Sequence, residues 1–154
     1  MSHPAAIART LVCGHHAGIA QVPWAKSPFR VRHAVNSVGR PLLLVRAAGA
    51  LDQALTPRDG DEDIALVLAV GDDRSRVWIS GWASVLEGLA ARAAALEFAE
   101  TNPAGDLLDV GRGFRLYRLD VAEVRLQCPA GHLTEVDADD YAAAEPEVSS
   151  SPVR

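Results

Sequence analysis

The stretch FRLYRLDVAEVRLQ, residues 114–127, is the longest strand-like segment of the chain. Its apolar side chains alternate regularly up to Val121, and the alternation resumes out of phase at Val124. Because successive side chains of a strand point to opposite faces, a one-residue slip of this kind requires an extra residue in the strand. The pattern therefore predicts a long strand that carries a β-bulge near Ala122 and Glu123.

Two segments upstream of this strand predict a hairpin. Residues 63–70, DIALVLAV, are continuously apolar, which is typical of a strand covered on both faces. Residues 76–88, RVWISGWASVLEG, alternate instead, and Gly81 in their middle indicates a bend or the close approach of another backbone. GDDR, residues 71–74, separates the two segments and favours a tight turn. The aromatic and hydroxyl side chains of the second segment share one face: Trp78, Ser80, Trp82 and Ser84.

Shorter elements flank this hairpin. Strands are expected at 17–22, 30–36 and 41–45 and again just after the long strand, and the clearest helix covers 89–102. Short connections between strands favour antiparallel pairing. The sequence therefore predicts a mainly β (α+β) protein, a barrel of about six to seven antiparallel strands with two or three peripheral helices.

Residues 1–144 are expected to form this barrel as one domain, because a chain of 154 residues can bury a sizeable core by itself. The last segment, EPEVSSSPVR (145–154), offers almost nothing to bury. We therefore expect it to be a disordered C-terminal tail.

The composition excludes several classes of partner. A net charge of −5 gives no general attraction to phosphate backbones, so nucleic acid is not an expected partner. No apolar run approaches the length of a membrane span, which is about 18 residues or more. Two cysteines without an export signal are typical of a reduced, cytoplasmic protein. The abundance of Ala, Arg, Gly and Asp favours a bacterial origin.

Cysteine and histidine occur together in two stretches, LVCGHHAGIAQV (11–22) and LQCPAGHLTEV (126–136). If the two stretches meet in space, they offer a Cys2His2 set of the kind that zinc prefers. The short spacing strains a tetrahedral site, and the CxxC pattern of zinc modules is missing, so no metal site is predicted. A disulfide is disfavoured by the compartment, and two buried thiols beside exposed histidines are the simpler interpretation. The residues in question are Cys13, His15, His16, Cys128 and His132.

The order of these elements resembles that of the FMN-binding split-barrel superfamily, the pyridoxamine 5′-phosphate oxidase-like proteins. The most similar branch contains the split-barrel haem oxygenases of bacterial haem utilisation. The resemblance covers about residues 5–144 and implies an antiparallel split β-barrel that forms a homodimer, with cofactor sites at the dimer interface. Four stretches carry it: ARTLVCGHHAGIAQV, GRPLLLVRAAGALDQAL, RVWISGWASVLEG and GFRLYRLDVAEVRLQCPAGHLTEVDADDYAAA.

The resemblance also implies where a cofactor would bind. In flavin-binding relatives the strand matching PLLLV leads to a hydroxyl residue that helps to hold the FMN phosphate, and Arg46 stands at that position here. The next short helix offers Gln53 alone as an amide donor. Arg32 would add a further charge and Trp82 an aromatic wall, with Arg30 and Arg58 also in reach in the sequence.

Relatives in the haem branch use a histidine in the C-terminal part of the chain as the iron ligand. His132, or alternatively His16, is the corresponding candidate here. The sequence thus indicates a flavin- or haem-associated protein, of oxidoreductase type, with no identifiable catalytic residue. The alternative is a cofactor-free binding or regulatory barrel with a degenerate flavin site.

Overall fold

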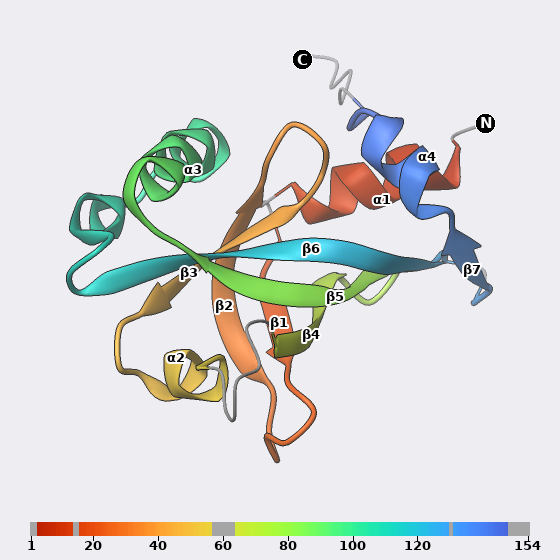
Figure 1. The fold of residues 1–154 in the computed structure, drawn as a ribbon. Coiled ribbons are helices and arrows are strands. Elements are labelled where there is room, and N and C mark those ends of the chain that lie inside the picture. The colour runs from red at the N-terminus through yellow and green to blue at the C-terminus, as the bar shows by residue number, and fades with distance from the viewer. Residues whose placement is uncertain (1–2, 14–15, 57–63, 130, 148–154) are drawn as a thin grey trace.

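Strands β5 (Arg76–Leu86) and β6 (Phe114–Gln127) form the long antiparallel pair that crosses the middle of the molecule (Figure 1). The computed structural model describes residues 3–13, 16–56, 64–129 and 131–147. In the β5–β6 pair Ser80 lies opposite Glu123 but Gly81 lies opposite Val121, so that Ala122 is the extra residue. The predicted bulge is confirmed.

Gly81 is required at this bulge. A Cβ atom on Gly81 would lie 2.0 Å from the backbone oxygen of Asp120 and 2.8 Å from its carbonyl carbon. Real Cβ atoms essentially never approach a backbone atom so closely. The glycine therefore permits the close approach of β6 that the sequence indicated.

Six of the strands close into a barrel because β3 pairs with both β2 and β6. The sheet order is β3-β2-β1-β4-β5-β6-β7, and all pairings between these strands are antiparallel. The predicted fold class, a mainly β antiparallel barrel, is confirmed. The remaining strands are β1 (Gly18–Gln21), β2 (Phe29–Val35), β3 (Pro41–Arg46), β4 (Ile64–Gly71) and β7 (Leu133–Val136).

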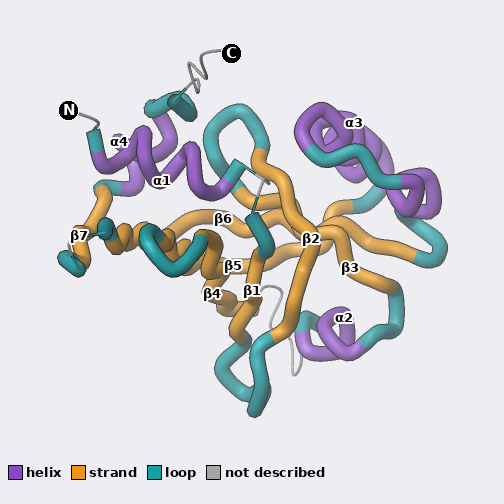
Figure 2. The backbone as a smooth tube through the Cα atoms, turned by 180° about the vertical axis from the view of Figure 1, so that it is seen from behind, coloured by secondary structure: helices purple, strands orange, loops and turns teal. Residues whose placement is uncertain are grey.

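Helices lie outside the barrel at both of its ends. Helices α1 (Pro4–Val12) and α4 (Ala138–Ala143) lie side by side near β7, whereas α3 (Gly88–Thr101) and the 3₁₀ turn η1 (Gly105–Asp109) lie at the opposite end (Figures 1 and 2). The short helix α2 (Ala50–Ala54) follows β3. No described helix is long and apolar enough to cross a membrane.

The apolar core has two parts. The interior of the barrel is filled mainly by branched aliphatic residues of the strands, and α1 and α4 cover one end of it. A second, smaller cluster lies between α3 and the outer face of β2, β3 and β6, and Phe98 is its fully buried anchor on α3. Burial of one such side chain contributes roughly 1.5–3 kcal/mol, so Phe98 is the main attachment of α3.

Helix α4 is held by a buried arginine of α1. The Arg9 guanidinium donates hydrogen bonds to the carbonyl oxygens of Tyr141 (3.0 Å), Ala142 (3.1 Å) and Ala144 (2.5 Å) at the end of α4, and to that of Ser37 (3.0 Å). The Tyr141 hydroxyl in turn donates to the carbonyl oxygen of Gly39 in the β2–β3 turn. The VDADDY motif thus ends in a residue that ties three segments of the chain together.

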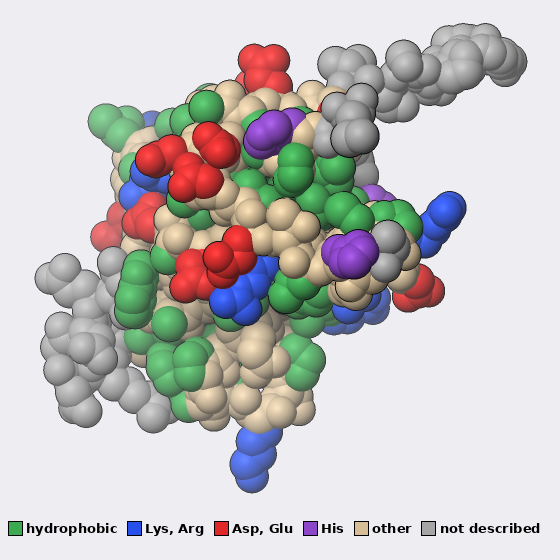
Figure 3. All heavy atoms as spheres, turned by 90° about the vertical axis from the view of Figure 1, so that its right-hand side faces the viewer, with side chains coloured by type: hydrophobic (Ala, Val, Ile, Leu, Met, Phe, Trp, Pro, Cys, Tyr) green, Lys and Arg blue, Asp and Glu red, His purple; other side chains and the backbone are tan. Residues whose placement is uncertain are grey.

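Among the described residues, the surface around β7 carries side chains of both charges. Acidic, basic and hydrophobic side chains are interspersed on this face of the molecule (Figure 3). Arg125 of β6 pairs there with Glu123 (3.5 Å) and with Glu135 of β7 (3.7 Å), all of them exposed. The expected C-terminal tail lies outside the described residues from residue 148 onward.

Candidate functional site

A pocket of about 670 Å³ opens beside β2 and β3, at the start of α2. Pockets that hold small molecules have volumes of about 300–1,000 Å³. We call it the arginine pocket, because three arginines line it and no described lining residue is Asp or Glu. The lining residues that matter for its chemistry are Arg30, Arg32, Arg46, His16, His33 and Phe114.

The alternation of β2 places two of the arginines. Arg30 and Arg32 are exposed on the outer face of the strand, whereas Val31 and His33 between and after them are buried. Arg46 is the last residue of β3 and is exposed where that strand leaves the barrel wall. Neighbouring strands in register thus bring arginines that are distant in the sequence to one rim.

Phe114 lies between two of these cations. The guanidinium carbons of Arg32 and Arg46 lie 5.6 and 5.9 Å from the centre of its ring, within the range of cation–π attraction. Arg32 also pairs with Asp106 of η1 (2.6 Å), and both side chains are partly exposed. Phe114 therefore contacts two guanidinium groups of the same pocket, and guanidinium groups are well suited to bind a carboxylate or phosphate.

His33 is buried at the inner side of the pocket. Its Nε2 lies 3.1 Å from the carbonyl oxygen of Val12, which can only accept, so Nε2 carries the proton. Burial lowers the pKa of His33 to about 4, against the opposite effect of this hydrogen bond, and nearby His16 lowers it further. His33 is therefore neutral at pH 7. Its Nδ1 lies against Gly18, where a Cβ would be only 2.7 Å away.

The loop that follows Arg46 is fixed from two sides. Ala48 has a left-handed backbone (φ 61°), its N–H donates to Asp52 Oδ2 (2.8 Å), and its carbonyl oxygen accepts from Gln53 Nε2 (3.0 Å). Asp52 is almost fully buried and also accepts from the Tyr117 hydroxyl. These contacts connect the loop beside the arginine pocket to α2 and, through Asp52, to β6.

The structure brings Arg32 and Arg46 together, as the resemblance implied, but places the other predicted site residues elsewhere. Gln53 does not line the pocket, because its amide holds the loop at Ala48. Trp82 is 52% exposed on the outer face of β5 and lines a separate shallow hollow of about 310 Å³. His132 is exposed in the turn between β6 and β7 and lines no described pocket.

The cysteine–histidine stretches do not supply a metal site within the described part of the chain. No three His, Cys, Asp or Glu side chains there lie close enough to hold a metal ion. Cys13 follows α1 and its thiol donates to the carbonyl oxygen of Thr10 (3.0 Å), whereas Cys128 begins the β6–β7 turn. His15 lies outside the described residues, as does Arg58.

Three residues of the pocket had little or no signal in the sequence. The sequence indicated Arg30 only as a further positive charge close to Arg32, and it gave no indication that His33 or Phe114 belongs to a site. The alternation of β2, with a histidine in phase with a buried valine, was the one available signal for His33. Phe114 reaches the pocket because β6 closes the barrel against β3, with Phe114 opposite Arg46. That pairing is a long-range contact without a local pattern.

The comparisons with solved structures show the fold. A haem-binding protein of Mycobacterium smegmatis is similar with a TM-score of 0.74 and 21% identity over 95% of this chain. ChuZ of Campylobacter jejuni is similar with a TM-score of 0.61 and 14% identity over 89% of this chain. A NimC/NimA family protein of Clostridium acetobutylicum is similar with a TM-score of 0.52 and 8% identity, and the match covers 81% of this chain and 86% of that protein.

This chain spans 62% of the Mycobacterium smegmatis protein and 59% of ChuZ. No family model and no curated protein matches the sequence. The resemblance to the FMN-binding split-barrel superfamily is confirmed at the level of the fold.

Proposed function

We propose that this chain binds a flat, acidic redox cofactor in the arginine pocket and acts as a homodimeric protein of oxidoreductase type. The observation that supports this proposal is the set of lining arginines, Arg30, Arg32 and Arg46, without a carboxylate among the described lining residues. Arg32 is already paired with Asp106, so the local excess of positive charge comes from Arg30 and Arg46, and in a protein of net charge −5 this excess favours an anionic ligand. The pocket volume of about 670 Å³ is that of a small-molecule site.

Haem is the first candidate. It carries two carboxylates, which Arg32 and Arg46 would hold, and His16 lines the same pocket and would be the iron ligand. His33 is less suited, because its Nε2 is committed to Val12 and its Nδ1 faces Gly18. A similar solved structure is that of a haem-binding protein. Bound haem would supply the redox chemistry, while the chain would orient it and limit access of water.

FMN is the second candidate, favoured by one specific position. Arg46 stands where flavin-binding relatives place a phosphate-holding hydroxyl, and the Phe114 ring orients its guanidinium. A charge-assisted hydrogen bond is worth about 1.5–3 kcal/mol, so Arg46 with Arg32 would replace part of the lost donor set. A cofactor-free regulatory barrel is the alternative to both.

The outer face of the sheet supports the proposed homodimer. Paired residues on neighbouring strands point to the same side, and one such row runs from Trp78 through Ala69 and Ile19 to Arg30. The apolar end of this row is only half-buried within one protomer, although β4 has the apolarity of a strand covered on both faces. A second copy on this face would complete its burial and border the arginine pocket.

An absorbance titration of the purified protein with haemin and then FMN tests the cofactor. A saturable Soret shift or flavin difference spectrum is expected, weakened about tenfold or more in Arg46→Ala. Arg74→Ala, in the exposed β4–β5 turn, is the matched control and should leave the affinity unchanged. Absence of saturable binding of either ligand would support the cofactor-free alternative.

Light scattering tests the dimer separately. Trp78→Asp would place a charge in the proposed interface and should yield a monomer, whereas Leu133→Asp, on exposed β7, should leave the dimer intact. A wild-type protein that is monomeric at all concentrations would rule out a cofactor site at a dimer interface.

A further inference from the structure

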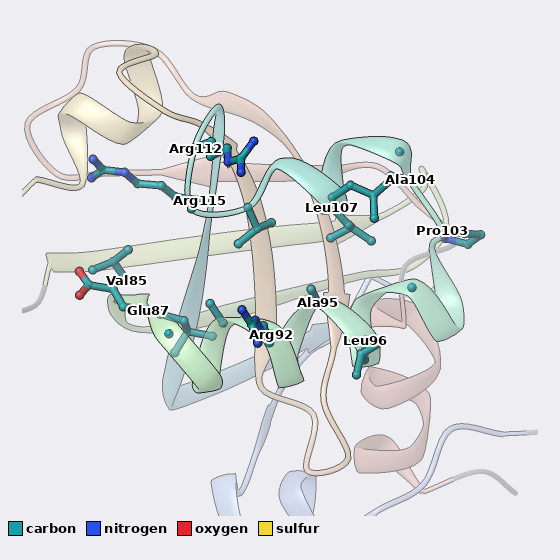
Figure 4. A pocket seen from close by; sticks show the side chains of 18 residues that line it. Val85, Glu87, Arg92, Ala95, Leu96, Pro103, Ala104, Leu107, Arg112 and Arg115 are labelled. Atoms are coloured by element: carbon teal, nitrogen blue, oxygen red, sulfur yellow. The ribbon is translucent and has the colours of Figure 1, made fainter.

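A second hollow, of about 1310 Å³, lies between α3 and η1, where β5 ends and β6 begins (Figure 4). We call it the α3 groove. The segment η1 lies between this groove and the arginine pocket. Asp106 of η1 forms an ion pair with Arg32 of the arginine pocket (2.6 Å). The two hollows have no lining residue in common.

The walls of the α3 groove are apolar and built largely from small residues. Ala91, Ala95 and Ala99 succeed one another at helical spacing on α3, and Leu107 faces them from η1 (Figure 4). Such a wall leaves room for an apolar body. The rim is unusually exposed for leucine: Leu96 is 72% exposed and Leu108 90%. Large exposed apolar patches of this kind mark binding surfaces.

The charges in the α3 groove are mostly positive. Arg92 of α3 and Arg112 of the loop after η1 line the groove from opposite walls, and Arg115 also lines it but extends away from α3 (Figure 4). Glu87 is the one acidic lining residue, so three positive charges against one negative give a formal charge of +2.

Two of these cations have no partner within the described part of the chain. Neither Arg92 nor Arg112 makes an ion pair or a side-chain hydrogen bond there, whereas Arg115 has Asp52 at 3.6 Å. Guanidinium groups beside apolar walls gain strongly from a carboxylate or phosphate that they can grip together.

We propose that the α3 groove binds an amphipathic small anion, a molecule with a long or flat apolar body and one carboxylate head. The apolar part would lie along the alanines of α3, and the head would lie between Arg92 and Arg112. The volume exceeds the usual range for small-molecule pockets, which extends to about 1,000 Å³, so a lipid-sized carboxylate fits. A second copy of this chain would not satisfy the arginines as well, since the α3 face that it would present carries Arg92 itself.

This site goes beyond the proposed cofactor function and does not depend on it. Its ligand is defined by an apolar body and a single head group, and the residues that grip it, Arg92 and Arg112, do not line the arginine pocket. The two proposals can therefore fail separately.

The test is calorimetric titration of the wild-type protein with palmitate and with its uncharged analogue hexadecanol, both below their aggregation concentrations. Palmitate should bind saturably at one site per chain, and hexadecanol at least tenfold more weakly. Arg92→Ala and Arg112→Ala should each weaken palmitate about tenfold or more, since each removes a charge-assisted hydrogen bond. Arg76→Ala, an exposed arginine at the start of β5, is the matched control and should have no effect.

Equal affinity for the acid and the alcohol would overturn the proposal, as would palmitate binding that neither arginine variant weakens. Leu96→Glu provides a second test, of whether the α3 groove is instead an interface between copies of the chain. Leu96 is exposed, so its substitution should leave folding intact. If this variant turns a wild-type dimer into a monomer, and the dimer binds no palmitate, the groove is an interface between copies and the proposal fails. Haemin binding should be unchanged in Arg92→Ala, which separates this site from the arginine pocket.

Discussion

The hydroxyl of Tyr117 on β6 donates a hydrogen bond of 2.5 Å to Oδ1 of Asp52 on α2, and both residues are almost fully buried. Burial, together with the neighbouring carboxylate, raises the pKa of Tyr117 above its ordinary value, so the hydroxyl keeps its proton and remains a donor. The other carboxylate oxygen of Asp52 accepts from the N–H of Ala48. One buried side chain thus connects the barrel wall to the loop beside Arg46.

A double-mutant cycle measures this connection. Asp52→Ala leaves the Tyr117 hydroxyl and the Ala48 N–H without an acceptor and should lower the free energy of unfolding by about 2–4 kcal/mol. Tyr117→Phe should cost less, and the pair should couple by about 1.5–3 kcal/mol in urea unfolding, because one hydrogen bond accounts for part of both losses. Simple additivity of the two losses would contradict the interpretation.

The bulge of β6 depends on the missing side chain of Gly81. Gly81→Ala would push a methyl group against the backbone oxygen of Asp120, so the pair must separate, and we expect a loss of about 3 kcal/mol or more. Gly105→Ala is the matched control, because nothing lies within 4 Å of its Cβ position and its φ is not positive. Thermal unfolding of the two variants should show a lowered Tm for the first alone.

Arg9 should be the residue on which the docking of α4 depends. Arg9→Met keeps much of the apolar stem but leaves the carbonyl oxygens of Tyr141, Ala142 and Ala144 without their donor. We expect a loss of about 2–4 kcal/mol and faster hydrogen exchange in α4 before the rest of the barrel. Arg74→Met, in the exposed β4–β5 turn, is the control; equal effects of the two substitutions would contradict the role of Arg9.

His33 should make the fold sensitive to acid. Its pKa is about 4 in the folded protein and about 6.5 when unfolded, so the unfolded chain binds more protons between these values. The contribution of His33 to the free energy of unfolding is therefore fully present above about pH 6.5. It is lost as the pH drops toward 4, and the loss is on the order of 3 kcal/mol.

Urea unfolding from pH 7.5 to 5 checks this slope while most carboxylates stay ionised. His33→Gln should flatten the slope over that interval, whereas His132→Gln, in the exposed β6–β7 turn, should leave it as in the wild type. A slope that His33→Gln does not change would assign the acid sensitivity to other groups.

Local patterns sufficed for most of the elements. The predicted strand at 114–127 has the observed bounds of β6, and the phase slip placed the bulge near Ala122 and Glu123, where the structure has it at Ala122, because side-chain alternation is a property of the strand itself. The alternation around Gly81 likewise separated the buried face of β5 from the face with Trp78 and Trp82. The turn η1 was not predicted, since a single turn is too short to show periodicity.

The functional surfaces were decided by tertiary structure. Arg32 and Arg46 line one pocket because β2 and β3 pair in one register, and Phe114 joins them only because β6 closes the barrel against β3. Gln53 was expected in the cofactor site, but its side-chain amide donates a hydrogen bond to the carbonyl oxygen of Ala48. The sequence by itself determined which segments become strands and which faces are apolar, because alternation and helical spacing act over a few residues. Which charges share a pocket depends on contacts between distant segments, and only the closed barrel specifies those.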